Sequence, residues 1–273
     1  MKYAVSVITP EVPGEAPLAL FEGDFSARLG KAKECGFQGI ELVTCDPAAL
    51  DGSLILRSLQ EHDLQAAAIA TGFIASSRGL TLISADPEVR AAAAKLLREL
   101  VLFAGAVNAP VVTIGSFHGK LAGAHGNVSK EEAAEQLREA MSSVDPLAES
   151  LGVCLALEPI RPADIDFLTN AKETCAFLEE GGFRSAGLLL DSFHVFGNEP
   201  DPLAAFDISK EKLVHVHLAD TSRLPVGKGE IDFAGMEAVL RGYGYAGWQS
   251  LELARAEDPD GNARVSMEYL RTL

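Results

Sequence analysis

The sequence has 273 residues, of which 48% are hydrophobic and 23% are charged, and its net charge is −16. This length and composition predict a globular α/β protein with a single domain over residues 1–273. The negative charge argues against nucleic acid as a partner, because phosphate backbones bind basic surfaces. The sequence contains no run of about 18 apolar residues, which argues against a membrane span.

The four cysteines, Cys35, Cys45, Cys154 and Cys175, show no CxxC spacing. In a chain of this length they are typical of reduced thiols in a cytosolic protein. The apolar stretch at the N-terminus is too short for a secretion signal. We therefore expect a soluble, cytoplasmic protein, and a homo-oligomer, dimer or tetramer, is compatible with the sequence.

Short apolar runs rich in β-forming residues alternate with helical segments along the chain. They predict eight strands, at residues 3–8, 39–43, 65–71, 110–115, 153–158, 187–191, 213–218 and 248–253. Their nearly continuous hydrophobicity is typical of parallel strands that are covered by helices on the outside.

Helix signals fall between these strands. Asp86 followed by proline predicts one helix start, Ser129 with Glu132 forms a capping-box pattern, and Asp232 is a third candidate N-cap. Glycines expected at helix C-termini precede several strands: Gly36, Gly105, Gly152, Gly182 and Gly244. Eight strand-then-helix units predict a closed (β/α)8 TIM barrel. A doubly wound open sheet is the alternative, but no Gly-x-Gly-x-x-Gly follows the first strand.

Four consecutive predicted strands end in ionisable residues: Glu158, Asp191, His217 and Glu252. One acidic strand end often only caps the next helix. Four in a row, at the barrel end where TIM-barrel enzymes carry their active sites, indicate a shared site. Three carboxylates and one imidazole suit one divalent cation, Mn²⁺ first and Co²⁺ or Mg²⁺ as alternatives. Such a set leaves coordination positions open for substrate oxygens.

Motifs in the second half of the chain resemble the sugar phosphate isomerase/epimerase superfamily, whose fold is the xylose-isomerase-like barrel. The motifs are Leu157-Glu158-Pro159, Gly187-Leu-Leu-Leu-Asp191-Ser192-Phe193-His194, His215-Val-His217-Leu-Ala-Asp220, Gly227-Lys-Gly229-Glu-Ile-Asp-Phe233 and Leu251-Glu252. Within that superfamily the chain looks most like the ketose 3-epimerases, which act on tagatose, allulose (psicose) and ribulose. The intervals of 33, 26 and 35 residues between the four ionisable strand ends match that group.

The resemblance implies a metal-dependent epimerase that inverts C3 of a free ketose or keto-sugar acid through a cis-enediolate. It implies that Glu158 and Glu252 are the catalytic acid–base pair as well as ligands. The chemistry supports this reading, because inversion requires a proton to leave one face of the carbon and another to return to the opposite face. A cation would stabilise the developing negative charge.

Further residues are candidates for binding the sugar. The resemblance implies that His194 contacts sugar oxygens near the metal, and that Arg223 reaches the substrate and one glutamate ligand; the alternative for each is an ordinary loop residue. Glu41, which ends the second strand, is a candidate for contact with the substrate or with a metal ligand, and helix capping is equally compatible. Ser116, and His118 beside it, follow the fourth strand and are candidates for the pocket wall.

Three further residues lie near these candidates in the sequence. His215 lies on the same side of its strand as His217, and we expect it one layer deeper, as a hydrogen-bonded core histidine. Gly227 and Gly229 are candidates for hinges of a catalytic loop or for an ordinary turn.

One segment departs from the family pattern. Where relatives commonly carry Asn-Arg-aromatic-Glu after the Glu-Pro of the fifth strand, this chain has Ile160-Arg161-Pro162-Ala163-Asp164. Asp164 takes the place of a substrate-binding glutamate but is one methylene shorter. The predicted metal site is unaffected by this change, whereas the identity of the sugar is left open.

Other functions fit the same platform. An aldose–ketose isomerase needs one well-placed carboxylate, a sugar or inosose dehydratase needs a general acid at the leaving hydroxyl, and a non-catalytic sugar- or metal-binding subunit needs neither. A nuclease resembling endonuclease IV would need three metals, and six histidines with a net charge of −16 argue against it.

The sequence favours a substrate without phosphate. The stretch after the last strand carries Glu257, Asp258 and Asp260 against one arginine, which would repel a phosphate dianion. Arg161 and Arg223 together could clamp a carboxylate, so a keto-acid remains open.

Overall fold

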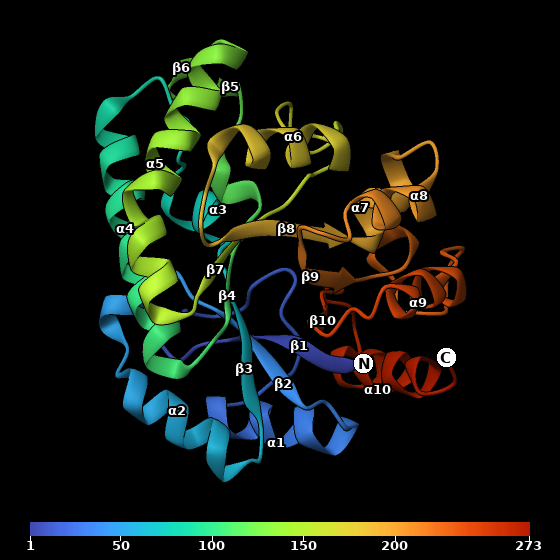
Figure 1. The fold of residues 1–273 in the computed structure, drawn as a ribbon. Helices are drawn as coiled ribbons and strands as arrows, with labels where there is room; N and C mark the ends of the chain where they lie inside the picture. The colour runs from blue at the N-terminus through green and yellow to red at the C-terminus, as the bar shows by residue number, and fades with distance from the viewer.

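Eight parallel strands close into a barrel in the computed structural model, which describes residues 1–273 (Figure 1). Around the barrel their order is β1-β10-β9-β8-β7-β4-β3-β2. The strands are β1 Lys2–Ile8, β2 Gly39–Val43, β3 Gln65–Ala70, β4 Val111–Ile114, β7 Cys154–Leu157, β8 Ala186–Asp191, β9 Leu213–Leu218 and β10 Trp248–Leu251. The predicted TIM barrel is confirmed, and the pairing of β1 with β10 excludes the open sheet.

Helices cover the outside of the barrel. They are α1 Phe25–Cys35, α2 Gly52–Glu61, α3 Ile74–Arg78, α4 Pro87–Val107, α5 Lys130–Leu151, α6 Ala171–Gly181, α7 Ser192–Asn198, α8 Pro202–Ile208, α9 Phe233–Gly242 and α10 Pro259–Leu270. Short 3₁₀ turns occur at Pro47–Ala49, Ser116–His118 and Thr221–Arg223, and a small hairpin joins β5 Ala122–Gly123 to β6 Gly126–Asn127. None of the helices combines the length and the apolar character that crossing a membrane requires.

Most of the predicted helix boundaries follow their local signals. Asp86 accepts the N–H of Glu88 at the start of α4, and Ser129 forms the complete capping box of α5 with Glu132. The expectation for Gly105 is wrong. That glycine lies inside α4, and the left-handed C-cap is Asn108 (φ 58°), one of the few other residues that adopt this conformation readily.

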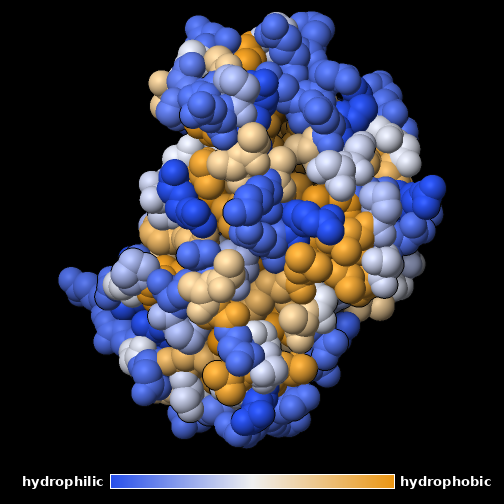
Figure 2. All heavy atoms as spheres, turned by 90° about the vertical axis from the view of Figure 1, so that its left-hand side faces the viewer, coloured by the Kyte–Doolittle hydropathy of each residue, from blue (hydrophilic) through white to orange (hydrophobic).

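The helices bury one face against the barrel and expose the other. Figure 2 shows the side of the molecule where α4 and α5 lie, with hydrophobic side chains gathered centrally among hydrophilic ones. Leu54, Leu102 and Leu151, on α2, α4 and α5, are 54%, 46% and 41% exposed. Leu96, Leu97 and Leu100 of α4 lie in the core instead.

The barrel interior is layered, because successive side chains on a strand point to opposite sides. Ala156 and Leu189 belong to one small buried cluster of neighbouring strands. Glu158 and Asp191 lie two residues further along the same chain segments and therefore follow this apolar layer toward the carboxyl end of the barrel. The polar layer at this end rests directly on a packed apolar one.

Strand register brings the ionisable residues to one height. Asp191 pairs with His217 across β8 and β9. Glu252 donates its N–H to the carbonyl of Leu218 at 3.0 Å, and Glu158 donates its N–H to the carbonyl of Ile114 at 3.0 Å. The four predicted residues thus stand side by side at the carboxyl ends of their strands.

Candidate metal centre and substrate cavity

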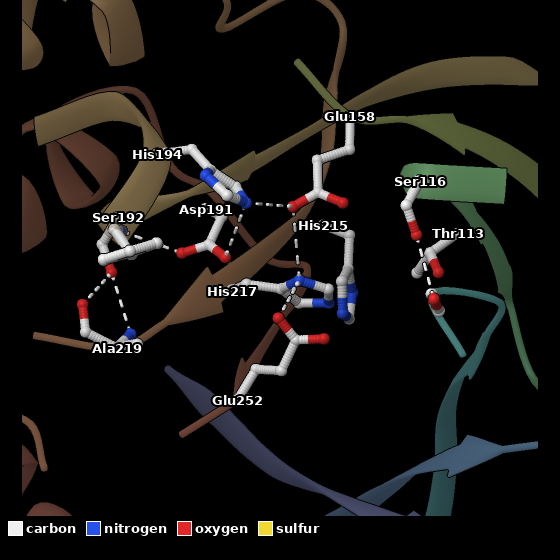
Figure 3. Close-up of polar contacts among 12 residues, drawn as sticks. Thr113, Ser116, Glu158, Asp191, Ser192, His194, His215, His217, Ala219 and Glu252 are labelled. Atoms are coloured by element: carbon white, nitrogen blue, oxygen red, sulfur yellow. Dashed lines mark hydrogen bonds and ion pairs between the residues drawn. The ribbon is translucent and has the colours of Figure 1, made fainter. Parts of the chain in front are cut away.

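The side chains of Glu158, Asp191, His217 and Glu252 converge at the mouth of the barrel. His217 Nδ1 lies 3.7 Å from Glu158 Oε1 and 3.5 Å from Glu252 Oε2. In the close-up the two glutamates approach this nitrogen from opposite sides, with Asp191 beside it (Figure 3). Glu158, Asp191 and His217 each offer a ligand atom within 4.8 Å of the others. The structure therefore brings together the four residues that the sequence singled out.

The donor set fits a divalent cation. His217 Nδ1 is buried and has no hydrogen-bond partner, although buried polar atoms are normally satisfied. The other ring nitrogen, Nε2, is 2.9 Å from Glu41 Oε1, so the unpartnered atom is the one that faces the carboxylates. A buried cluster of two glutamates, an aspartate and an imidazole, with one ring nitrogen left without a hydrogen-bond partner, is consistent with a divalent metal site.

Arg223 provides positive charge inside this cluster. Its Nη1 lies 2.8 Å from Asp191 Oδ2 and 2.7 Å from Glu252 Oε2, and its Nη2 is 3.2 Å from His194 Nε2. Burial alone would raise the pKa of Asp191, but the charges of Arg223, His194 and His217 and the hydrogen bond from the Phe193 N–H together outweigh it and lower that pKa below its usual value. Asp191 is therefore held as a carboxylate.

Glu252 behaves differently from Asp191. Burial raises the pKa of Glu252 to about 7, and the charges of His217 and Arg223 offset only part of this increase. A carboxyl group with a pKa near neutrality can gain and lose a proton at physiological pH. This property suits a general acid or base.

Glu41 lies behind His217 and not against the substrate cavity. Its Oε2 is 2.8 Å from His215 Nε2 and its Oε1 is 2.9 Å from His217 Nε2, and its side chain is fully buried. Both carboxylate oxygens are thus occupied by imidazoles, which leaves none for a sugar. Of the roles considered for Glu41, the geometry fits support of a ligand. His215 occupies the deeper layer expected for it.

A cavity of about 410 Å³ opens above the cluster. Its ionisable and hydroxyl-bearing walls are formed mainly by the predicted site residues: Ser116, Glu158, Asp164, His194, Arg223 and Glu252. The remaining walls are largely apolar, with Phe73, Ile160 and Phe193 among them. His118, by contrast, is fully buried and does not line this space.

The residues at the rim of the cavity engage one another. His194 Nε2 lies 4.0 Å from Glu158 Oε1, and its Nδ1 lies 4.0 Å from Asp164 Oδ2. Arg161 Nε pairs with Asp164 Oδ2 at 2.6 Å. Ser116 donates its hydroxyl to the carbonyl of Gly72 at 2.9 Å. Asp164 therefore faces the cavity from the loop that departs from the family pattern.

The sequence suggested no role for two residues that organise this end of the barrel. Ser192 donates its hydroxyl to the carbonyl of Ala219 at 2.8 Å and joins the ends of β8 and β9, as Figure 3 shows. Asp220 accepts backbone N–H groups, including those of Gly227 and Gly229. Those glycines belong to a hydrogen-bonded turn, the second of the two roles considered for them. An acidic residue after a strand and before a glycine-rich loop was the available signal.

Comparison with known proteins agrees with the fold. A family model described as the xylose isomerase-like TIM barrel matches residues 29–273. The chain belongs to the xylose isomerase-like TIM barrel family.

Its relatives in the family include sugar epimerases. It is 28% identical to an L-ribulose 3-epimerase of Mesorhizobium japonicum over 92% of this chain and 83% of that protein. It is 27% identical to a ketose 3-epimerase of Arthrobacter globiformis over 80% and 73% of the two chains. A D-allulose 3-epimerase from Methylomonas sp. in complex with D-allulose has the same fold, with a TM-score of 0.84 and 22% identity over 100% of this chain and 96% of that one.

The contact between Glu41 and His217 yields a first prediction. In Glu41→Gln the side chain loses its charge and presents an amide N–H to one of two imidazole N–H groups. We expect the Kd for Mn²⁺, measured by titration calorimetry, to rise by about 10- to 100-fold, as for other partners of metal ligands. Glu61→Gln, an exposed change at the end of α2, is the control and should leave the Kd unchanged. Equal Kd values for Glu41→Gln and the wild type would contradict this role.

Cation binding should also depend on pH. Burial lowers the pKa of His217, but the charges of Glu41 and Glu252 outweigh it and raise that pKa well above its usual value. Because a cation must displace protons from His217 Nδ1 and from Glu252, the affinity for Mn²⁺ should fall by about tenfold or more per unit as the pH falls from 8 to 6. Calorimetry in buffers of different ionisation enthalpy measures the protons released. An affinity independent of pH, without proton release, would refute this.

Proposed function

We propose that the protein is a divalent-metal-dependent epimerase that inverts C3 of a free ketose, with Mn²⁺ as the preferred cation. The observation that carries the proposal is the position of Glu158 and Glu252 on opposite sides of His217 Nδ1, beneath one cavity. The ketose 3-epimerases among its relatives support the same reaction class. Glu158, Asp191, His217 and Glu252 would hold the cation.

The two glutamates would transfer the protons. With the sugar between them, one carboxylate would take the proton from C3 and the other would return a proton to the opposite face. When bound, the cation supplies a Lewis acid that stabilises the negative charge developing on the substrate oxygens. The pKa of Glu252, raised by burial to about 7, suits either direction of transfer. Which glutamate acts as the base depends on the configuration of the substrate at C3.

His194 and Arg223 would orient the sugar. Both line the cavity next to the glutamates, and the guanidinium of Arg223 contacts Glu252 Oε2 at 2.7 Å. Burial lowers the pKa of His194, which favours the neutral imidazole, able to donate one hydrogen bond and accept another. Apolar walls such as Phe73 and Ile160 would limit the access of water to the reacting carbon.

Paired carboxylates favour epimerisation over the alternatives. An aldose–ketose isomerase moves a proton between neighbouring carbons on one face and needs only one of the glutamates. A dehydratase needs a single acid at the leaving hydroxyl. A binding subunit would have no use for a carboxyl group whose pKa burial raises to about 7 within the cavity wall.

The charges around the cavity favour an unphosphorylated substrate. Arg161 is paired with Asp164, and Arg223 with Asp191 and Glu252. Arg255, the arginine after β10, is engaged by Glu15 at 2.8 Å and Glu22 at 3.1 Å. A phosphate or carboxylate would have to compete with a protein carboxylate for each of these guanidinium groups. A neutral ketose would not.

The proton-transfer scheme predicts exchange with solvent. The Mn²⁺-loaded enzyme, incubated in D₂O with D-allulose, D-tagatose and L-ribulose in turn, should place deuterium at C3 of the epimerised product. Glu158→Gln and Glu252→Gln should each lower kcat by about 10²- to 10⁴-fold, because each removes an acid or base. Glu257→Gln, an exposed change beyond β10, should leave kcat unchanged. Epimerisation without deuterium at C3, or full activity in either site variant, would disprove the scheme.

A matched pair of substrates tests the preference for a free sugar. We expect kcat/KM for a ketopentose to exceed that for its 5-phosphate by about tenfold or more, which corresponds to at least about 1.4 kcal/mol in the transition state. Initial rates with L-ribulose and L-ribulose 5-phosphate at equal ionic strength give the ratio. A higher kcat/KM for the phosphate would reverse this part of the proposal.

A further inference from the structure

We propose that Asp220 is a positioning residue, which fixes the guanidinium of Arg223 in the site through the loop between β9 and α9. The inference rests on the proposed function, in which Arg223 faces the substrate. Asp220 does not touch the cavity, so its effect on the reaction has to pass through another residue.

The carboxylate of Asp220 is the centre of this loop. It is fully buried and forms no ion pair with Lys, Arg or His. Instead it accepts four backbone N–H groups. Oδ1 accepts those of Thr221 at 2.8 Å and Ile231 at 3.1 Å, and Oδ2 accepts those of Gly227 at 3.0 Å and Gly229 at 2.8 Å. One side chain thus closes the whole segment from residue 221 to residue 231.

The backbone that carries Arg223 needs such a support. Ser222 (φ 58°) and Arg223 (φ 60°) both lie in the left-handed region, where non-glycine residues are uncommon. For each of them this conformation is less stable than the right-handed one. Consecutive residues of this kind persist where the surroundings determine the backbone, and they occur at functional sites. Here the conformation directs the Arg223 side chain back over the barrel mouth.

Both ends of the segment are tied to strands of the site. Ser192, which follows Asp191, accepts the N–H of Ala219 through its hydroxyl at 3.0 Å, just before Asp220. The carbonyl of Arg223 accepts the N–H of Ala254 at 3.1 Å, two residues after Glu252. The loop is therefore fastened beside both carboxylates that its arginine contacts.

The glycines of the loop match this arrangement. Gly227 has φ +82°, which favours glycine, and its N–H faces Asp220. A Cβ at Gly229 would overlap the Asp220 carboxylate and the Thr221 hydroxyl. The Gly227-Lys-Gly229 sequence thus allows two backbone N–H groups to approach one carboxylate oxygen closely.

A loop fixed in this way sets the position of the Arg223 guanidinium. Arg223 Nη1 contacts Asp191 Oδ2, Glu252 Oε2 and the carbonyl of Glu252, at 2.8, 2.7 and 3.1 Å. These contacts tolerate displacements of only a few tenths of an ångström, and a shift of about 1 Å in a catalytic group can lower a rate about 100-fold. Removing an acceptor from the loop should therefore lower the rate by displacing the guanidinium of Arg223.

A double-mutant cycle separates this role from general support of the fold. Asp220→Asn keeps the shape but turns one oxygen into a donor that faces two N–H groups. Alone, it should lower kcat/KM by about 10- to 100-fold. In an Arg223→Ala background it should change kcat/KM less than twofold, because the residue through which it acts is gone. The control is Asp232→Asn, an exposed N-cap that accepts the N–H of Gly235 in the same connection, and it should not alter kcat/KM.

The Kd for Mn²⁺, measured over the same four proteins, gives a second readout that requires no turnover, because Arg223 contacts two of the ligands. Asp220→Asn should change this Kd, upward or downward, by at least threefold in the wild-type background. In the Arg223→Ala background it should leave the Kd unchanged. A wild type that binds Mn²⁺ but epimerises no ketose would contradict the proposed function, and the Kd cycle would still decide the inference.

Equal losses in both backgrounds, or unchanged kcat/KM and Kd in Asp220→Asn, would overturn the positioning role. If Asp220→Asn fails to fold, Gly229→Ala takes its place in the cycle, since its methyl group displaces the same carboxylate.

Discussion

Three carboxylates gathered around one imidazole nitrogen are the constraint on which the rest of this structure depends. Glu158, Asp191 and Glu252 would repel one another strongly in a buried site unless positive charge or protons compensated them. The protein supplies one guanidinium, from Arg223, and burial nevertheless raises the pKa of Glu252 to about 7. A divalent cation bound there would supply further compensating charge.

The barrel makes this concentration of charge tolerable. Apolar side chains such as Ala156 and Leu189 pack beneath the carboxylates and fix the strands that carry them. Glu41 accepts hydrogen bonds from His215 and His217. Because its Nε2 is bound to Glu41, the imidazole of His217 can turn only Nδ1 toward Glu158, Asp191 and Glu252. The pieces of the site are therefore held by the barrel interior and by short loops, which favours a centre that is organised before a ligand arrives.

The sequence predicted those parts that are encoded locally. Each strand is a short apolar run, and in four of them an ionisable residue lies within one position of the end of the run. The barrel and the convergence of Glu158, Asp191, His217 and Glu252 could therefore both be anticipated. Helix starts at Asp86 and Ser129 were visible for the same reason, because a cap bonds to residues two or three positions away.

Contacts between distant segments could not be read in this way. Glu41 reaches His217 across 176 residues, so its place behind the metal ligand became clear only in the closed barrel. The role of Asp220 depends on four backbone N–H groups, which residue types do not reveal. At the end of α4, Gly105 and Asn108 were both able to adopt the left-handed cap, and the C-cap is Asn108.

The account is tested most directly by a crystal structure of the Mn²⁺-loaded protein, with the ion located by its anomalous scattering. It predicts one ion bound by Glu158, Asp191, His217 through Nδ1, and Glu252, with ligand distances of about 2.0–2.4 Å. An ion held by Glu41 and His215, or Mn²⁺ absent from the mouth of the barrel at saturating concentration, would contradict it.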